Sequence, residues 1–220
     1  MTKETPAPPF PAPDTCYLYL LRHGATANNL QKPPHLQGRR ADVPLDPAGQ
    51  RQAEAAGEFL ARYRLDAVYT SPLLRTRQTA AAIAHPHALT PVVIDDLIEC
   101  DVGDWEGRAW PEIEQNDHEA WRLFREDPIV HPYGGGENMA QVVARIEPVF
   151  AELLEKHRGQ AIAVVAHNVV NRVYLALRLG WPLARCREIL QNNAGINLIS
   201  YRDGKATVLT VNSVFHLPQW

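Results

Sequence analysis

Residues 18–29 read LYLLRHGATANN, and in this stretch an apolar run leads directly into Arg22, His23 and Gly24. The run over residues 16–21 predicts a buried strand, because it is short, apolar and contains aromatic residues. A guanidinium and an imidazole both prefer water, so a buried strand end is an unusual place for them. Either the two side chains are satisfied by the protein itself, or they meet a ligand at this point.

Strands and helices alternate along the rest of the chain. We expect further strands at 67–70, 92–94 and 161–166, and helices after Asp46-Pro47, after Ser71-Pro72 and from Asn168 to Gly180. Residues 202–205, Arg-Asp-Gly-Lys, separate two apolar runs and predict a β-hairpin. This alternation predicts an α/β fold, a three-layer sandwich with a mostly parallel central sheet.

One stretch interrupts the alternation. Residues 104–138 contain three of the five tryptophans, among many acidic residues. We interpret 104–138 as a mostly helical insertion over the edge of the sheet, and two forms remain open: a lid, or an ordinary helical layer with buried indoles. The proline-rich residues 1–14 predict a disordered leader, which leaves 15–220 as a single domain.

Composition narrows the class of protein. The formal net charge of −3 argues against a nucleic-acid partner. No apolar run approaches the roughly 20 residues of a membrane-spanning helix, so we expect no membrane partner. Cys16, Cys100 and Cys186 are odd in number and form no metal-finger or CxxC spacing, which favours reduced thiols. We therefore expect a soluble, cytoplasmic protein.

Chemically active side chains follow several of the predicted strands. Arg22 and His23 follow the first, Arg75 lies in the helix after the second, Glu99 lies beyond the third, and His167 follows the fourth. Singly, each has an ordinary explanation as a structural histidine, a helix-surface charge or a solvated carboxylate. Because parallel sheets gather ligand groups at the carboxyl ends of their strands, we expect all five in one crevice.

The motifs around these residues resemble the histidine phosphatase superfamily, in its phosphoglycerate-mutase-like branch. LRHGATANN carries the Arg-His-Gly signature, with matching residues Arg22, His23, Gly24, Thr26 and Asn29. The other matching stretches, in family order, are LQGRRADVPLDPAGQRQA, VYTSPLLRTRQTA with Arg75, LIECDVGDWEG with Glu99, YGGGENMAQVVAR, and VVAHNVVNRV with His167. The resemblance covers roughly residues 15–210 and makes 15–220 a histidine-phosphatase-like catalytic domain.

The resemblance implies a phosphomonoester hydrolase that acts on a small phosphorylated metabolite through a phosphohistidine on His23, without a metal or another cofactor. Arg22, Arg75 and His167 would bind the phosphate oxygens through charge-assisted hydrogen bonds. Glu99 would protonate the leaving alkoxide and then accept a proton from water. The further residues expected to bind the phosphate or the substrate are Gly24, Asn29, Gln37, Gly38 and Asn168.

The proposed nucleophile has physical requirements of its own. Attack on phosphorus needs a neutral His23 ring, and two nearby guanidiniums should lower the pKa of that ring. A backbone carbonyl that accepts from its other nitrogen would fix the tautomer. Two residues depart from the commonest family pattern: Ala25 replaces a polar residue, and Asn168 replaces a glycine. Whether Asn168 crowds the pocket or adds a donor is open.

Two other functions remain as alternatives. A phosphoglycerate mutase would transfer the phosphoryl group to a bound product, but DVGDWEG after the acid motif resembles the phosphatase branch. A non-catalytic phosphate-binding or scaffold protein on the same fold would lack the nucleophile or the acid, and both are present. Few lysines in 104–138 predict a substrate with a neutral or partly apolar body. The apolar C-terminus, VFHLPQW, allows a homodimer as well as coverage of its own core.

Overall fold

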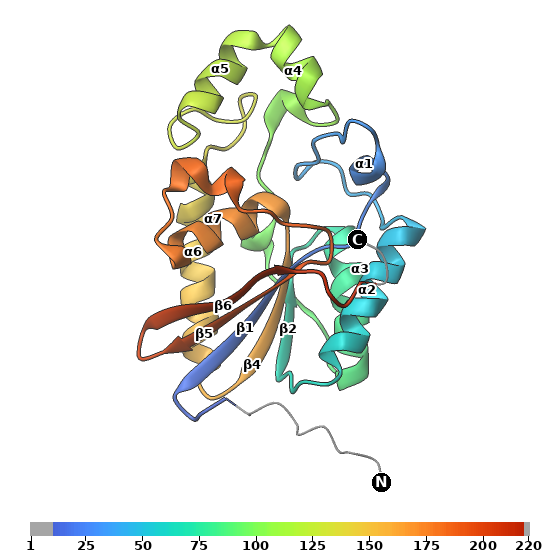
Figure 1. The fold of residues 1–220 in the computed structure, drawn as a ribbon, viewed down its shortest axis with the longest axis vertical. Helices are drawn as coiled ribbons and strands as arrows, with labels where there is room; N and C mark the ends of the chain where they lie inside the picture. Colours follow the sequence, from blue (N-terminus) through green and yellow to red (C-terminus); the bar gives the residue numbers. More distant parts are fainter. Residues whose placement is uncertain (1–10, 218–220) are drawn as a thin grey trace.

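The computed structural model describes residues 11–217, and within them six strands form one sheet in the order β3-β2-β4-β1-β5-β6. Strands β1, β4, β2 and β3 run parallel, whereas β5 pairs antiparallel with β1 and β6 antiparallel with β5. The predicted mostly parallel sheet is therefore confirmed (Figure 1). The strands are β1 (Thr15–Arg22), β2 (Ala67–Thr70), β3 (Val92–Val93), β4 (Ala161–Ala166), β5 (Ile196–Arg202) and β6 (Lys205–Ser213).

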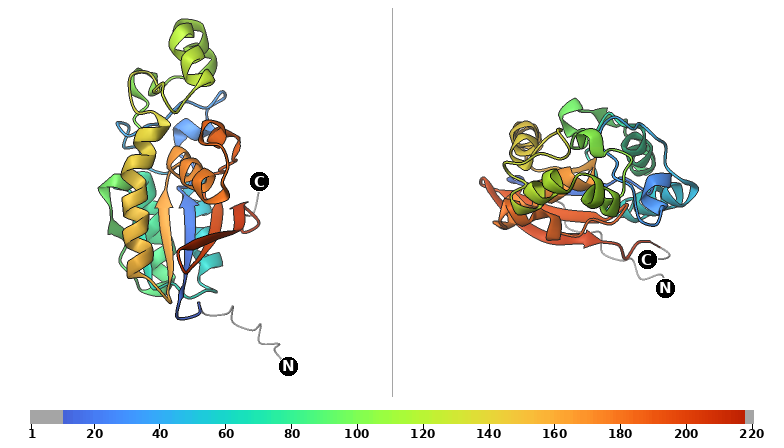
Figure 2. Two further views of the ribbon diagram at one scale, coloured as in Figure 1. Left: turned by 90° about the vertical axis from the view of Figure 1, so that its left-hand side faces the viewer. Right: turned by 90° about the horizontal axis from the view of Figure 1, so that it is seen from above.

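Helices cover both faces of this sheet. The α-helices are α1 (Ala27–Leu30), α2 (Pro47–Leu60), α3 (Leu74–Ala84), α4 (Trp110–Asn116), α5 (His118–Glu126), α6 (Met139–Lys156) and α7 (Asn168–Leu179). Short 3₁₀ helices are η1 (His85–His87), η2 (Asp95–Leu97), η3 (Gly103–Trp105) and η4 (Leu183–Glu188). Helices α2 and α3 pack on one face, and α6 and α7 on the other (Figures 1 and 2). The three-layer sandwich is confirmed.

The central strand β1 shows why residues 16–21 are apolar. Leu18 and Leu20 are buried in the cluster that α6 and α7 share, whereas Tyr19 and Leu21 are buried against α2 and α3. Successive side chains of a strand point to opposite faces, so a strand covered on both faces needs apolar residues at every position. The apolar run ends at the carboxyl end of the strand, where Arg22 and His23 follow.

Local signals in the sequence match the ends of several elements. Asp46 caps α2 by accepting from Ala48 N, and Gly180 ends α7 with a φ of 63°. Asp203 and Gly204 also have positive φ, as a two-residue hairpin turn requires. The expected strand at 92–94 is shorter, because only Val92–Val93 pairs with β2.

The segment 104–138 contains α4 and α5, which lie beyond the carboxyl ends of β1 and β4 (Figure 1). Trp105 is 1% exposed, and its ring lies 5.6 Å from Phe124 and 6.2 Å from Tyr133. These rings belong to the same buried cluster as the residues of α6 and α7, so the segment shares the main core. Its motion as a lid stays a prediction.

Each end of the described chain bears on an expectation. Residues 1–10 of the predicted leader lie outside the described residues, and within residues 11–14 Asp14 pairs with Arg202 at 2.8 Å. At the other end, Val214 and Leu217 are buried against Ala194 and cover the chain's own core. Residues 218–220 lie outside the described residues. The division into a leader and one domain, and the homodimer, stay predictions.

Candidate active site

The sheet brings the two predicted histidines together. Arg22 and Ala166 are paired at the ends of β1 and β4, so His23 and His167 leave the sheet side by side. Their ring centroids lie 5.3 Å apart, and the rings meet edge to face. Ser71 follows β2 at the same edge, and its hydroxyl lies 2.7 Å from His167 Nε2. The carboxyl ends of three parallel strands therefore form one site.

The His23 ring is held in a defined tautomer. Its Nδ1 lies 2.7 Å from the carbonyl oxygen of Gly24, which can only accept a hydrogen bond. Nδ1 therefore carries the proton, and Nε2 of the neutral ring keeps its lone pair. Burial holds the pKa of His23 well below its usual 6.5, and the charges of Arg75 and Arg22 lower it further. Both requirements of a nucleophilic imidazole are met.

Two guanidiniums at the site, the buried Arg75 and the partly buried Arg22, form no ion pair with a carboxylate within residues 11–217. Arg75 donates to the carbonyl oxygens of Gly38 and Ala41, both at 2.8 Å, and Arg22 donates to Gln191 O at 2.7 Å. The Nε of each arginine has no hydrogen-bond partner among the described residues. Buried charges are normally paired, so this arrangement favours an anionic ligand.

His167 has the complementary arrangement. The Ser71 hydroxyl occupies its Nε2, whereas Nδ1 is buried without a partner among the described residues. Burial, together with the charges of Arg75 and His23, holds the pKa of His167 well below its usual value. The Ser71 oxygen accepts from Leu73 N, and its own proton can be donated to His167 Nε2. In that tautomer the ring proton is on Nδ1, which is then a free donor. The helix predicted to follow Ser71-Pro72 begins at Leu74.

Glu99 is buried beside these groups. Its Oε1 accepts from Cys100 N at 2.9 Å, and Oε2 accepts from Val169 N at 3.2 Å. Burial raises the pKa of the carboxyl above its usual 4.5, although these two hydrogen bonds and the charge of Arg75 oppose the rise. A carboxyl with a raised pKa is suited to donate a proton near neutral pH.

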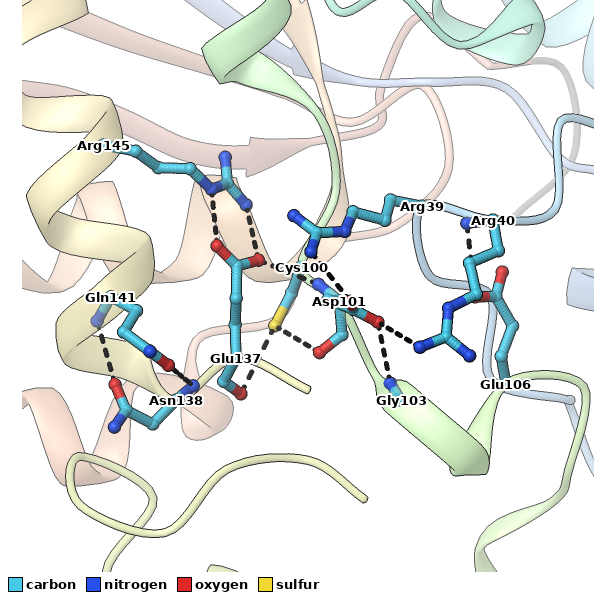
Figure 3. Close-up of polar contacts among 10 residues, drawn as sticks. All are labelled: Arg39, Arg40, Cys100, Asp101, Gly103, Glu106, Glu137, Asn138, Gln141 and Arg145. Carbon is cyan, nitrogen blue, oxygen red and sulfur yellow. Dashed lines mark hydrogen bonds and ion pairs between the residues drawn. The ribbon is translucent and has the colours of Figure 1, made fainter. Parts of the chain in front are cut away.

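Figure 3 shows the polar network that holds the segment after Glu99. Asp101 accepts from Arg39 Nη2 at 2.8 Å and donates its backbone N–H to Glu137 Oε2 at 2.8 Å. Arg145 binds Glu137 with two donors, Nε at 2.9 Å and Nη2 at 3.1 Å. The network joins the Glu99 loop to α6 and to the loop before α2, so it fixes the position of the acid.

A cavity of about 360 Å³ opens over these groups. Of the predicted residues, those in its lining are Arg22, His23, Asn29, Gln37, Glu99 and Asn168. Asn168 Oδ1 and Gln37 Nε2 are buried there without partners among the described residues. Asn168 thus adds a polar side chain to the cavity, and its unpartnered atom is an acceptor rather than a donor.

Four predicted residues lie behind the cavity lining: Gly24, Gly38, Arg75 and His167. The backbone N–H of Gly24 donates to Thr79 Oγ1 at 3.1 Å, so its expected contact with phosphate is corrected. Gly24 instead supplies the carbonyl for His23, and Gly38 the carbonyl for Arg75. Ala25, the second departure from the family pattern, is buried and donates its N–H to Gln52.

The sequence did not single out several residues of the cavity wall. They are Trp110, Tyr133, Arg172, Arg187 and Asn193, together with Ser71 behind His167. Arg172 lies one turn beyond Asn168 in α7, a spacing that could have indicated it. Arg187 comes from η4, where the sequence offers no signal. Arg172 and Arg187 make this wall cationic, whereas the substrate body was expected to be neutral or partly apolar; that expectation stays a prediction.

Two other kinds of feature are absent from the part of the chain that the structure describes. Within residues 11–217, no group of three or more His, Cys, Asp and Glu side chains is placed to hold a metal ion. In the same range, no helix combines the length and apolar character needed to span a bilayer. The cytoplasmic location stays a prediction.

Comparison with known proteins gives a family and several relatives. Residues 18–214 match the family model of the "Histidine phosphatase superfamily (branch 1)". Phosphoserine phosphatase 1 of Hydrogenobacter thermophilus is 31% identical over 81% of this chain and 85% of its own length. The metal-independent phosphoserine phosphatase of Arabidopsis thaliana is 32% identical over 91% of this chain and 82% of its own. A phosphoserine phosphatase of Entamoeba histolytica, solved with 3-phosphoglyceric acid, superposes with a TM-score of 0.83 at 25% identity, covering 92% of this chain and 99% of that one.

Proposed function

The chain belongs to the histidine phosphatase superfamily and is a phosphatase of small phosphorylated metabolites, and from this premise we propose that it hydrolyses phosphate monoesters through a phosphohistidine on His23. One arrangement supports this most directly. A neutral His23 ring with a free Nε2 lies 5.3 Å from the His167 ring, beside Arg22 and Arg75, neither of which forms an ion pair with a carboxylate among residues 11–217. This is a nucleophile next to a binding site for a dianion.

In the first step, His23 Nε2 attacks phosphorus and the bond from phosphorus to the ester oxygen breaks. Glu99 gives its proton to the departing oxygen, so the alcohol leaves uncharged. Arg22, Arg75 and His167 Nδ1–H bind the equatorial oxygens, whose charge they stabilise in the transition state. The raised pKa of Glu99 keeps this proton available.

In the second step, a water molecule attacks the phosphohistidine. The ionised Glu99 accepts a proton from that water while the bond from phosphorus to Nε2 breaks. Inorganic phosphate leaves, His23 is neutral again and Glu99 is protonated for the next turnover. Asn29, Gln37 and Asn168 line the cavity where the ester body enters, and we assign them to substrate binding.

The test measures phosphate release from a panel of small phosphomonoesters by the parent protein, by His23→Ala and by a control variant, His85→Ala, whose side chain is exposed. We expect release by the parent and the control only. Rapid denaturation at alkaline pH during turnover, which preserves the acid-labile bond from phosphorus to nitrogen, should trap one phosphoryl group on the parent, seen by intact mass. Equally fast release by His23→Ala would contradict the proposal.

The same experiment separates the two alternatives. Conversion of 3-phosphoglycerate to 2-phosphoglycerate without phosphate release would assign a mutase. Binding of phosphate esters without any turnover would assign a phosphate-binding or scaffold protein.

A further inference from the structure

Two arginines of the cavity wall have no part in the mechanism. Arg172 projects from α7 and Arg187 from η4, and both line the catalytic cavity together with Arg22. Both also line a second pocket on the outer side, together with Arg125 and Arg185. The two guanidiniums therefore lie between the catalytic cavity and the surface, where the body of a bound ester would extend.

Neutral groups hold both side chains in place. Arg172 Nε donates to the carbonyl oxygen of Ile189 at 2.9 Å, an uncharged acceptor that leaves the terminal nitrogens available to a ligand. The Arg187 guanidinium lies over two rings, 4.7 Å from Trp110 and 5.1 Å from Phe124. Cation–π contacts of this kind orient a guanidinium without neutralising it.

Neither arginine has a carboxylate within ion-pair distance among residues 11–217. Neighbouring arginines on the same elements do: Arg178 pairs with Glu147, and Arg185 with Glu188. Arg172 and Arg187 are partly buried and lie close to one another, and neither has a carboxylate partner among these residues. Their like charges therefore repel one another. Burial and the charges of Arg125 and Arg172 both lower the pKa of Arg187. A bound anion would relieve both effects.

The charge of the cavity lining also favours an anionic ligand. Its lining contains one carboxyl group, Glu99, against the three arginines Arg22, Arg172 and Arg187. In the proposed mechanism Arg22 and Arg75 bind the transferred phosphate, which leaves Arg172 and Arg187 without a role. A substrate with a neutral body would leave Arg172 and Arg187 unused.

We propose that Arg172 and Arg187 form a second anionic subsite, which binds a carboxylate or a second phosphate on the body of the ester. This inference rests on the proposed function, because the subsite is defined relative to a phosphate at His23. The substrate is then a small ester with two anionic ends rather than one with a neutral or partly apolar body. The insertion contributes by fixing Arg187 through Trp110 and Phe124.

The test compares esters that differ in one charge. 3-Phosphoglycerate and glycerol 3-phosphate differ by a carboxylate in place of a hydroxymethyl group, and fructose 1,6-bisphosphate and fructose 6-phosphate differ by one phosphate. We expect the parent to have a higher kcat/KM for the doubly charged ester in at least one pair. The pair that shows the preference identifies the second anion as a carboxylate or a phosphate.

Arg187→Met should abolish that preference. Loss of one charge-assisted interaction should lower kcat/KM about tenfold to a hundredfold for the doubly charged ester, with little change for its partner ester. Arg185→Met is the matched control, because Arg185 lies on the same short helix and outside the catalytic cavity. Thermal unfolding of both variants verifies that they are folded.

Two results would overturn the subsite: no preference of the parent in either pair, or an equal loss for both members of a pair in Arg187→Met. The latter would assign Arg187 a structural role. Neither result touches the proposed function, which fails separately if the parent releases no phosphate or if His23→Ala releases it equally fast.

Discussion

Glu99→Gln removes a titratable proton from the candidate active site and keeps the size of the side chain. The two carboxylate oxygens accept from Cys100 N at 2.9 Å and from Val169 N at 3.2 Å. A glutamine has one oxygen and can accept only one of these bonds. The other buried N–H loses its acceptor, which costs about 1–3 kcal/mol of folding free energy and lowers Tm by roughly 2–4 °C per kcal/mol. This is less than the stability of an ordinary domain, so we expect a folded variant.

The kinetic effect of Glu99→Gln should depend on the leaving group. General acid catalysis contributes about a hundredfold to ten-thousandfold, or about 3–5.5 kcal/mol of the barrier. We expect this full loss for an alkyl ester such as glycerol 3-phosphate, whose alkoxide needs the proton. p-Nitrophenolate leaves without one, so phosphorylation of His23 by p-nitrophenyl phosphate should be slowed far less.

Rapid mixing separates the two steps. With p-nitrophenyl phosphate, Glu99→Gln should release a burst of one p-nitrophenolate per protein and then turn over slowly, because water no longer has its base. Intact mass should show the variant carrying a phosphoryl group. Glu114→Gln, at an exposed position of α4, is the control and should behave like the parent. A burst phase slowed equally for the aryl and the alkyl ester would refute the assignment of Glu99 as the acid.

Three further outcomes are expected. Only protonated Glu99 can donate a proton, and burial raises its pKa. The rate of single-turnover cleavage of alkyl esters should therefore decline as the pH rises through that pKa. A rate that increases there would exclude Glu99 as the general acid. Arg75→Met should lower kcat/KM about a hundredfold to a thousandfold, whereas Arg77→Met, on the exposed side of α3, should match the parent in the same assay. In urea unfolding, Glu137→Gln should lower the free energy of unfolding by roughly 2–3 kcal/mol, because its partner Arg145 is left largely buried without a charge partner. The control Glu155→Gln, in an exposed ion pair, should change it little. Equal losses in the two variants would mean that the network around the Glu99 loop stabilises the fold no more than an exposed pair does.

Much of the site could be predicted from local rules in the sequence. His23 and His167 each come directly after an apolar strand, and parallel strands place the residues at their carboxyl ends along one edge of the sheet. The structure accordingly places their rings 5.3 Å apart although 144 residues separate them. Glu99 and Arg75 were located in the same way, from their distance to a strand end.

The sequence was less informative about the partner that each hydrogen-bonding group would have. Gly24 was expected to bind the phosphate or the substrate, but its N–H donates to Thr79 on α3. A helix was expected after Ser71-Pro72, and the contact between the Ser71 hydroxyl and His167 was not foreseen. A hydrogen-bonding group has several local candidates for a partner, and only the packed fold selects one of them.

By itself the sequence determined the fold class, because periodic burial and strand ends are local patterns, and its motifs indicated the family and the residues that we propose to bind and transfer a phosphoryl group. Only the tertiary structure decided what else surrounds that phosphate. Arg172 and Arg187 reach the cavity from α7 and η4, and an insertion between α3 and α6 supplies the rings against which Arg187 lies. Proximity of this kind depends on the packing of elements far apart in the chain, which no local pattern records, and it is what we expect to select the substrate.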